Sequence, residues 1–174
     1  MGDRAALFCF KVRRQDAWSE GAMEHRSEDK TFQYRSRTTW RSARQGLLSA
    51  SQRPDIVVGS PPEWGGTLVN WAPEELLIGA VNSCIMLTFL TLAKVRRVDL
   101  VGYESDVEGT LEKVSGVYQM TKITVRPRAV VASEEERAAA LRAMDHVEAH
   151  CFMSQSVKAT VTLIPEIAVA TSPQ

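Results

Sequence analysis

A chain of 174 residues with 21 lysine and arginine residues, 21 aspartate and glutamate residues and a net charge of zero is typical of one globular domain. The balanced charge argues against a protein that relies on general attraction to nucleic acid or to an anionic membrane. Three cysteines do not fit a secreted disulfide scaffold, so we expect a reducing compartment, the cytoplasm, in which any disulfide is transient.

The first part of the chain predicts a leader followed by a group of strands. Residues 1–30 are charged and irregular, which is typical of a poorly ordered leader. The segment 31–40, TFQYRSRTTW, alternates aromatic and polar side chains and predicts a half-buried strand. Gly46 marks a turn, and the segments 47–52 and 55–60 predict a second and a third strand.

A long apolar helix is expected next, after a loop at 61–66 that contains two prolines and two glycines. Pro73 suits the first turn of a helix, and Glu74 and Glu75 suit the positive end of its dipole. We expect the helix to continue to about Arg97 and, because it is apolar on nearly all sides, to be central and buried. Its asparagine, serine and threonine residues argue against a membrane span.

The second half of the chain predicts a hairpin and another helix. The segments 101–113 and 117–131 alternate in character across a short turn, as the two strands of a β-hairpin do. A second helix is expected over 133–150, where Ser133 and Glu136 form a capping-box pattern.

The order of these elements predicts an α+β fold. A last strand is expected over 156–167, and the strands are grouped rather than alternating strictly with helices. We therefore expect one domain over 31–167, preceded by the leader at 1–30 and followed by a loose tail at 168–174.

Two cysteines carry the first candidate chemistry. Cys84 lies inside the first helix and Cys151 just past the second. Because both helices can pack on the same sheet, the two thiols could meet. A thiolate attacks the O–O bond of a peroxide and becomes a sulfenic acid, and a neighbouring thiol condenses with it to a disulfide. On spacing alone, two inert cysteines that pack as small apolar residues are the preferred interpretation.

Residue types suggest two other kinds of site, a metal site and a nucleic-acid contact. His146 and His150 are four residues apart on the predicted helix, beside Cys151, which is a spacing that metal ligands can have. Since no fourth ligand is marked, a solvated helix face is the preferred interpretation, and we expect no metal. The basic segment 40–46, WRSARQG, could contact nucleic acid, but at zero net charge an exposed strand face is preferred.

Four segments of the chain, taken together and in order, resemble the OsmC/Ohr family of thiol-dependent peroxidases, which reduce organic hydroperoxides. The resemblance covers residues 31–167. The segments are RQG at 44–46, PPEWGG at 61–66, PEELLIGAVNSC at 73–84 and HCFMSQSV at 150–157.

The resemblance implies a role for each site residue. Cys84 would be the peroxidatic thiolate and Cys151 the resolving thiol. Arg44 would stabilise the thiolate and orient the peroxide, and Glu74 would hold that arginine by a charge-assisted pair, with Glu75 as the alternative.

The resemblance also implies the assembly and its partners. The family has antiparallel sheets packed around a central helix and forms tightly interlocked homodimers with active sites at the interface. It uses no metal or organic cofactor and is reset by a dithiol, for which a lipoylated protein is a candidate. The apolar residues around Cys84 favour bulky organic hydroperoxides over hydrogen peroxide.

Two features depart from the family pattern, and one alternative function stays open. In many members proline follows the second cysteine, whereas Phe152 follows it here. Cys9 lies outside the match and is expected to be incidental. The alternative is a non-catalytic protein of the same fold that binds a small hydrophobic ligand at the dimer interface.

Overall fold

The computed structural model describes residues 30–171. The chain divides into two units, Met1–Tyr34 and Arg35–Gln174, and every helix and strand described below belongs to the second unit. The predicted leader up to residue 29, which includes Cys9, lies outside the described residues.

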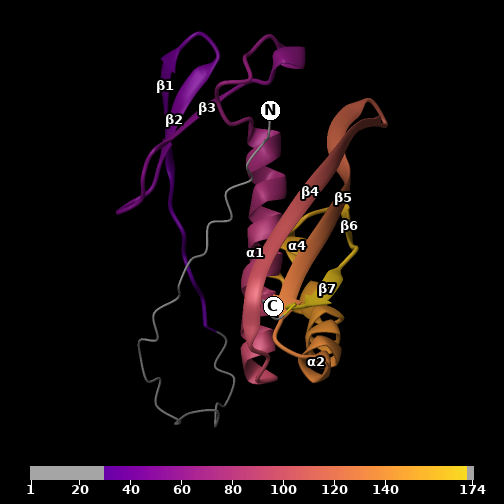
Figure 1. The fold of residues 1–174 in the computed structure, drawn as a ribbon. Helices are drawn as coiled ribbons and strands as arrows, with labels where there is room; N and C mark the ends of the chain where they lie inside the picture. The colour runs from indigo at the N-terminus through magenta and orange to yellow at the C-terminus, as the bar shows by residue number, and fades with distance from the viewer. Residues whose placement is uncertain (1–29, 172–174) are drawn as a thin grey trace, which may run out of the picture. The chain divides into compact units, whose positions relative to one another are not determined.

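The first sheet is a three-stranded antiparallel sheet in the order β1-β2-β3 (Figure 1). Its strands are β1 (Arg37–Ser42), β2 (Gln45–Ser49) and β3 (Ile56–Gly59). The prediction of a half-buried strand over 31–40 is wrong in its start and in its burial, because the strand begins at Arg37 and all six of its residues are exposed. Its alternating side chains have no covering layer among the described residues.

The loop after β3 requires glycine at positions 65 and 66. A short 3-10 helix, η1 (Pro62–Trp64), ends at Gly65, which has a left-handed φ of 76° that favours glycine. A Cβ atom at Gly66 would overlap the backbone carbonyl of Ser60, so this position admits only glycine.

Helix α1 (Pro73–Val95) begins at the predicted proline and ends two residues before the predicted end. One face of the helix is buried, at the four-residue spacing that places side chains on one line of a helix. The buried residues are Val81, Ile85, Phe89 and Ala93.

The opposite face of α1 is only partly covered by the residues that the structure describes. We define this outer face by Leu76, Ala80, Leu87 and Leu90, of which Leu87 is 59% exposed. Within the described residues of one chain this face is not buried, and its contact with a partner subunit stays a prediction. Among the described residues, α1 is the one helix long and apolar enough, with a mean hydropathy of 2.0, to cross a membrane by length and composition, a criterion that core helices of soluble proteins also meet.

The second sheet is built on a long hairpin of β4 (Leu100–Val114) and β5 (Val117–Val131), close to the predicted segments. Two short strands, β6 (Thr160–Leu163) and β7 (Glu166–Val169), then pair with β5 in parallel. The prediction of purely antiparallel sheets is wrong here, because a crossover of helices returns the chain to β5 in the same direction. The sheet is mixed.

The predicted helix over 133–150 is broken into pieces. Helix α2 (Glu134–Met144) is followed by α3 (Val147–His150) and α4 (Phe152–Ser156). The predicted capping box is present, since the Glu136 N–H donates to Ser133 Oγ at 3.3 Å and the Ser133 N–H donates to a Glu136 oxygen at 3.1 Å. The breaks place Cys151 between α3 and α4 rather than after one continuous helix.

The main core lies where α1 meets the β4–β5 hairpin and the later helices (Figure 1). It contains the α1 stripe, together with apolar residues of β5 and α2 and one cysteine, Cys151. Each fully buried aliphatic or aromatic side chain contributes about 1.5–3 kcal/mol, so this cluster fixes where α1 sits against the hairpin and α4.

Candidate functional site

Cys84 lies in the middle of α1, at the border between the buried stripe and the outer face. It is partly buried and packs against the core cluster. Leu87 of the outer face lies one turn further along, because residues three apart are neighbours on a helix. The helix therefore holds the thiol rigidly while leaving it partly exposed.

Cys151 has the opposite environment, since it is 0% exposed. It is the N-cap residue of α4, where a side chain usually accepts a hydrogen bond from a backbone N–H of the first turn. Here the thiol sulfur takes that role and accepts from the Ser154 N–H at 3.4 Å. Both cysteines are free thiols.

The fold brings the two thiols together, because the Cys84 and Cys151 side chains lie close enough to shift each other's pKa. Burial raises the pKa of Cys84, but hydrogen bonds outweigh burial and leave that pKa below the ordinary value. Burial raises the pKa of Cys151, and the neighbouring Cys84 raises it further. In this pair Cys84 is the more acidic thiol.

Three groups that lower the pKa of Cys84 were not predicted from the sequence. The backbone groups of Met153 and Phe152 lower the pKa of Cys84 by hydrogen bonds from the start of α4, and the Thr88 side chain does so from the next turn of α1. Thr88 could have been found from its four-residue spacing to Cys84. The backbone donors could not, because they depend on the helix break that places α4 beside α1.

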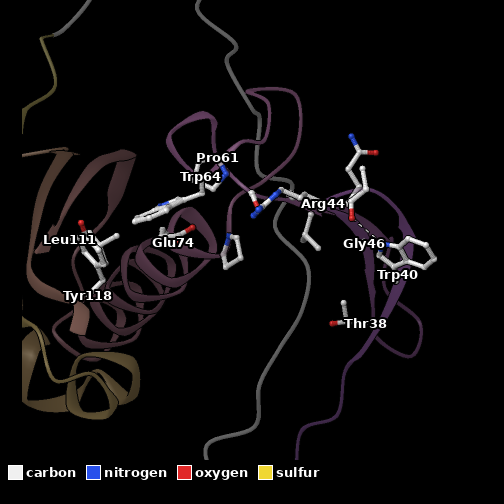
Figure 2. A pocket seen from close by; sticks show the side chains of 15 residues that line it. Thr38, Trp40, Arg44, Gly46, Pro61, Trp64, Glu74, Leu111 and Tyr118 are labelled. Atoms are coloured by element: carbon white, nitrogen blue, oxygen red, sulfur yellow. Dashed lines mark hydrogen bonds between the residues drawn. The ribbon is translucent and has the colours of Figure 1, made fainter. Parts of the chain in front are cut away.

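Arg44 and Glu74 line a different region, a pocket of about 790 Å³ between the first sheet, the start of α1 and the tip of the β4–β5 hairpin. Figure 2 shows the Arg44 side chain extending from the β1–β2 turn toward the side of the pocket where Trp64 and Glu74 lie. Trp64 and Tyr118 stack edge to face, with ring centroids 5.2 Å apart. The pocket thus combines aromatic walls with one cation and one carboxylate.

Glu74 and Glu75 have separate tasks. Glu75 accepts a hydrogen bond from the Ala72 N–H at 2.8 Å and so caps α1. Glu74 lines the pocket, and its Oε2 atom is buried without a hydrogen-bond partner among the described residues. The geometry therefore separates the capping glutamate from the glutamate whose carboxylate is free to accept a ligand or a cation.

The two groups of predicted site residues do not meet within one chain. Cys84 follows Glu74 by ten residues (84 − 74 = 10), or about 15 Å along the axis of α1. Neither cysteine lines the pocket of Arg44 and Glu74. Among the residues 30–171, no ion pair joins Arg44 to Glu74.

The metal alternative finds no support in the part of the chain that the structure describes. No group of three or more histidine, cysteine, aspartate or glutamate residues is arranged there to hold a metal ion. His150 Nδ1 lies 2.8 Å from the His146 carbonyl oxygen, so one ring nitrogen is engaged with the backbone, and Cys151 is buried away from solvent.

Comparison with known proteins bears on the family and the fold of the chain. A family model described as OsmC-like protein matches residues 65–166. The uncharacterized protein YmaD of Bacillus subtilis (strain 168) is 26% identical over 115 residues, which cover 64% of this chain and 77% of that protein.

Solved structures share the fold at low identity. An OsmC-like protein of unknown function from Vibrio cholerae has a TM-score of 0.72 and 22% identity, covering 78% of this chain and 99% of that chain. An organic hydroperoxide resistance protein from Elizabethkingia anophelis has a TM-score of 0.65 and 12% identity, covering 82% and 99%. The shared architecture is the α+β fold with a long helix that the sequence predicted.

Proposed function

Because this chain belongs to the OsmC-like protein family, we propose that it is a thiol-dependent peroxidase that reduces organic hydroperoxides. Structural neighbours that are named organic hydroperoxide resistance proteins, from Elizabethkingia anophelis and from Legionella pneumophila, support this class of reaction.

The observation that carries the proposal is the asymmetry of the facing thiols. Hydrogen bonds hold the pKa of Cys84 below its ordinary value, and burial holds the pKa of Cys151 above it. Only the thiolate is a nucleophile, so the partly exposed Cys84 suits attack on a peroxide, and the protonated Cys151 suits the later step.

The proposed reaction has two chemical steps. The Cys84 thiolate attacks the terminal oxygen of the hydroperoxide, an S–O bond forms, the O–O bond breaks, and the alkoxide takes up a proton and leaves as the alcohol. The Cys151 sulfur then attacks the sulfenic sulfur of Cys84. A disulfide forms, and the hydroxyl leaves as water with the proton that Cys151 carried.

We also propose that the working unit is a homodimer. The outer face of α1 is apolar and only partly covered by residues 30–171, and Cys84 borders it. A second copy packed on that face could bring its own Arg44 and Glu74 to Cys84, which one chain cannot do. The Arg44 guanidinium would then orient the peroxide, and Glu74 would use its unpartnered oxygen to hold the guanidinium.

The reset of the enzyme needs two electrons. A dithiol reductant, for which a lipoylated protein is a candidate, would reduce the disulfide and become a disulfide itself. Such a reset requires a compartment that keeps dithiols reduced, as the cytoplasm does.

The first test is peptide mass spectrometry without reduction, on reduced protein before and after an equimolar amount of cumene hydroperoxide. We expect a new Cys84–Cys151 crosslink and the matching amount of cumyl alcohol. Cys84→Ser should abolish both products, Cys151→Ser should stop at a Cys84 sulfenic acid, and Cys9→Ser should behave as the wild type. Free thiols and intact peroxide after the reaction would overturn the peroxidase.

A second candidate function is favoured by the size of the pocket. A volume of about 790 Å³ with aromatic walls fits a small hydrophobic ligand. A binding protein would hold such a ligand equally well after Cys84→Ser and would consume no peroxide, so the same variant separates the two functions.

A further inference from the structure

The two sulfurs of the thiol pair differ sharply in how a reductant could reach them. Cys84 is partly exposed at the edge of α1, whereas Cys151 is 0% exposed and lies under the first turn of α4. In thiol–disulfide exchange the attacking thiolate must approach one sulfur along the line of the S–S bond, and access decides which sulfur is attacked. A thiol from solvent meets Cys84 first.

Ser154 supplies a second asymmetry, because it contacts Cys151 in two ways. Its backbone N–H donates to Cys151 Sγ at 3.4 Å. Its hydroxyl lies near enough to Cys151 to lower the pKa of that thiol, against the larger opposing effect of burial. The Ser154 hydroxyl oxygen is itself buried and has no hydrogen-bond partner among the described residues, so the hydroxyl is free to donate to a negative sulfur. The backbone N–H and the hydroxyl of Ser154 can therefore both donate hydrogen bonds to a Cys151 thiolate.

We propose that the reducing dithiol attacks the sulfur of Cys84 in the disulfide, and that Ser154 is a positioning residue that stabilises the Cys151 sulfur as the leaving thiolate. This inference rests on the proposed function, because it describes how the disulfide of that reaction is reset.

The electron balance of the reset is complete. A thiolate of the dithiol forms a new S–S bond to Cys84, and the Cys84–Cys151 bond breaks with both electrons on Cys151. The second thiol of the reductant then displaces the Cys84 thiolate and closes a cyclic disulfide. The two protons of the dithiol end on the two cysteines, so the reductant is oxidised by two electrons and the protein is reduced by two.

One effect opposes this direction of attack. A more acidic thiol is the better leaving group, and Cys84 is the more acidic of the pair in the reduced protein. However, one of the donors that lowers the pKa of Cys84 is the Cys151 thiol, and that proton is absent in the disulfide. The Ser154 donors stay with Cys151 in both states, and burial bars direct attack on Cys151.

The decisive experiment maps the mixed disulfide. The wild-type protein is oxidised with diamide, which forms the disulfide without any peroxide, and is then treated for short times with N-acetylcysteine and quenched with N-ethylmaleimide. We expect N-acetylcysteine on Cys84 and maleimide on Cys151, in roughly tenfold excess over the reverse pattern when extrapolated to zero time. The reverse pattern, or no Cys84–Cys151 disulfide with diamide, overturns the inference.

The role of Ser154 has its own matched variants. Ser154→Ala should slow the reduction of the diamide-formed disulfide by dithiothreitol by about fivefold, because one hydrogen bond to the leaving sulfur is lost. Ser154→Thr, which keeps the hydroxyl, should restore most of the rate. If dithiothreitol reduced the disulfide of Ser154→Ala at the wild-type rate, Ser154 would have no role in the reset.

These readouts separate the inference from the proposed function. If the protein leaves cumene hydroperoxide unreduced but the adduct still maps to Cys84, the peroxidase fails and the direction of exchange stands. If the peroxide is reduced but the adduct maps to Cys151, the peroxidase stands and the inference fails.

Discussion

Phe152 shows how one residue changes the chemistry of a neighbouring thiol. It follows Cys151, at the position where many members of the family have proline. Proline has no backbone N–H, whereas the Phe152 backbone forms a hydrogen bond that lowers the pKa of Cys84. This chain therefore gains a donor to its thiolate that a proline would not supply, and the donor comes from the backbone rather than from a charged side chain.

Phe152→Pro should raise the pKa of Cys84 without disturbing α4, because residue 152 is the first residue of that helix and proline is accommodated there. The thiolate fraction falls as pH drops through the pKa, so near neutral pH the alkylation of Cys84 by iodoacetamide should be roughly fivefold slower than in the wild type. At high pH, where both proteins are ionised, the rates should converge.

The matched control is Phe152→Ala, which keeps the N–H and should keep the wild-type pH profile of Cys84 alkylation, read peptide by peptide in the mass spectrometer. Equal profiles for the proline and alanine variants would show that the Phe152 N–H does not act on Cys84.

At the scale of elements, α1 carries two adjacent glutamates with different tasks. Glu75 folds back on the Ala72 N–H and satisfies one of the donors that the start of a helix leaves open. Glu74 makes no such contact, and its buried oxygen faces no partner among the described residues. A helix start thus supplies both its own cap and a carboxylate for the pocket.

Glu75→Ala should lower the free energy of unfolding by about 1 kcal/mol, because a capping interaction is lost. Glu74→Ala should leave the unfolding free energy nearly unchanged but slow peroxide reduction, because Glu74 has a proposed role in holding Arg44. Thermal unfolding at a fixed protein concentration and cumene hydroperoxide consumption measure the two effects. The opposite assignment, with Glu75→Ala inactive but stable, would contradict the separation of tasks.

For the whole molecule, the central question is what covers the outer face of α1. The helix buries one stripe in its own chain and leaves Leu87 59% exposed on the other side. Contiguous exposed apolar surface of this kind marks an interaction site. In the proposed homodimer this face meets a second copy, and the same contact completes the site around Cys84.

If the proposed homodimer forms through this face, Leu87→Glu should convert it to monomers and abolish most of the peroxide reduction, because a charge at the apolar contact disfavours association. The secondary structure by circular dichroism should persist, since Leu87 is exposed in the isolated chain. Sedimentation velocity gives the oligomeric state. Leu141→Glu, at an exposed apolar position of α2, is the control and should remain dimeric and active.

Several features were predictable from the sequence because they depend on residues near one another in the chain. Pro73 marks the start of α1, and the Ser133–Glu136 capping box marks the start of α2. Both signals act within one helical turn. The hairpin of β4 and β5 also followed from local alternation across a short turn.

Other features depended on contacts between distant segments. The parallel pairing of β6 and β7 with β5, the break in the helix after Met144 and the exposure of β1 have no local signature in the sequence. The candidate site likewise has one part that the sequence predicted and another that depends on tertiary contacts. Residue types suggested Cys84 and Cys151 as a pair, but the donors from Phe152 and Met153 appear only once α4 is seen beside α1.

The sequence by itself determined the α+β class and the long apolar helix, because composition and periodicity are properties of a linear chain. The roles of Cys84 and Cys151 follow from the family resemblance and stay a prediction. Tertiary structure alone decided which thiol is acidic, which is buried, and that Arg44 and Glu74 lie in a pocket apart from both cysteines. Those properties depend on desolvation and on hydrogen bonds between segments far apart in the chain, and these exist only after the chain has folded.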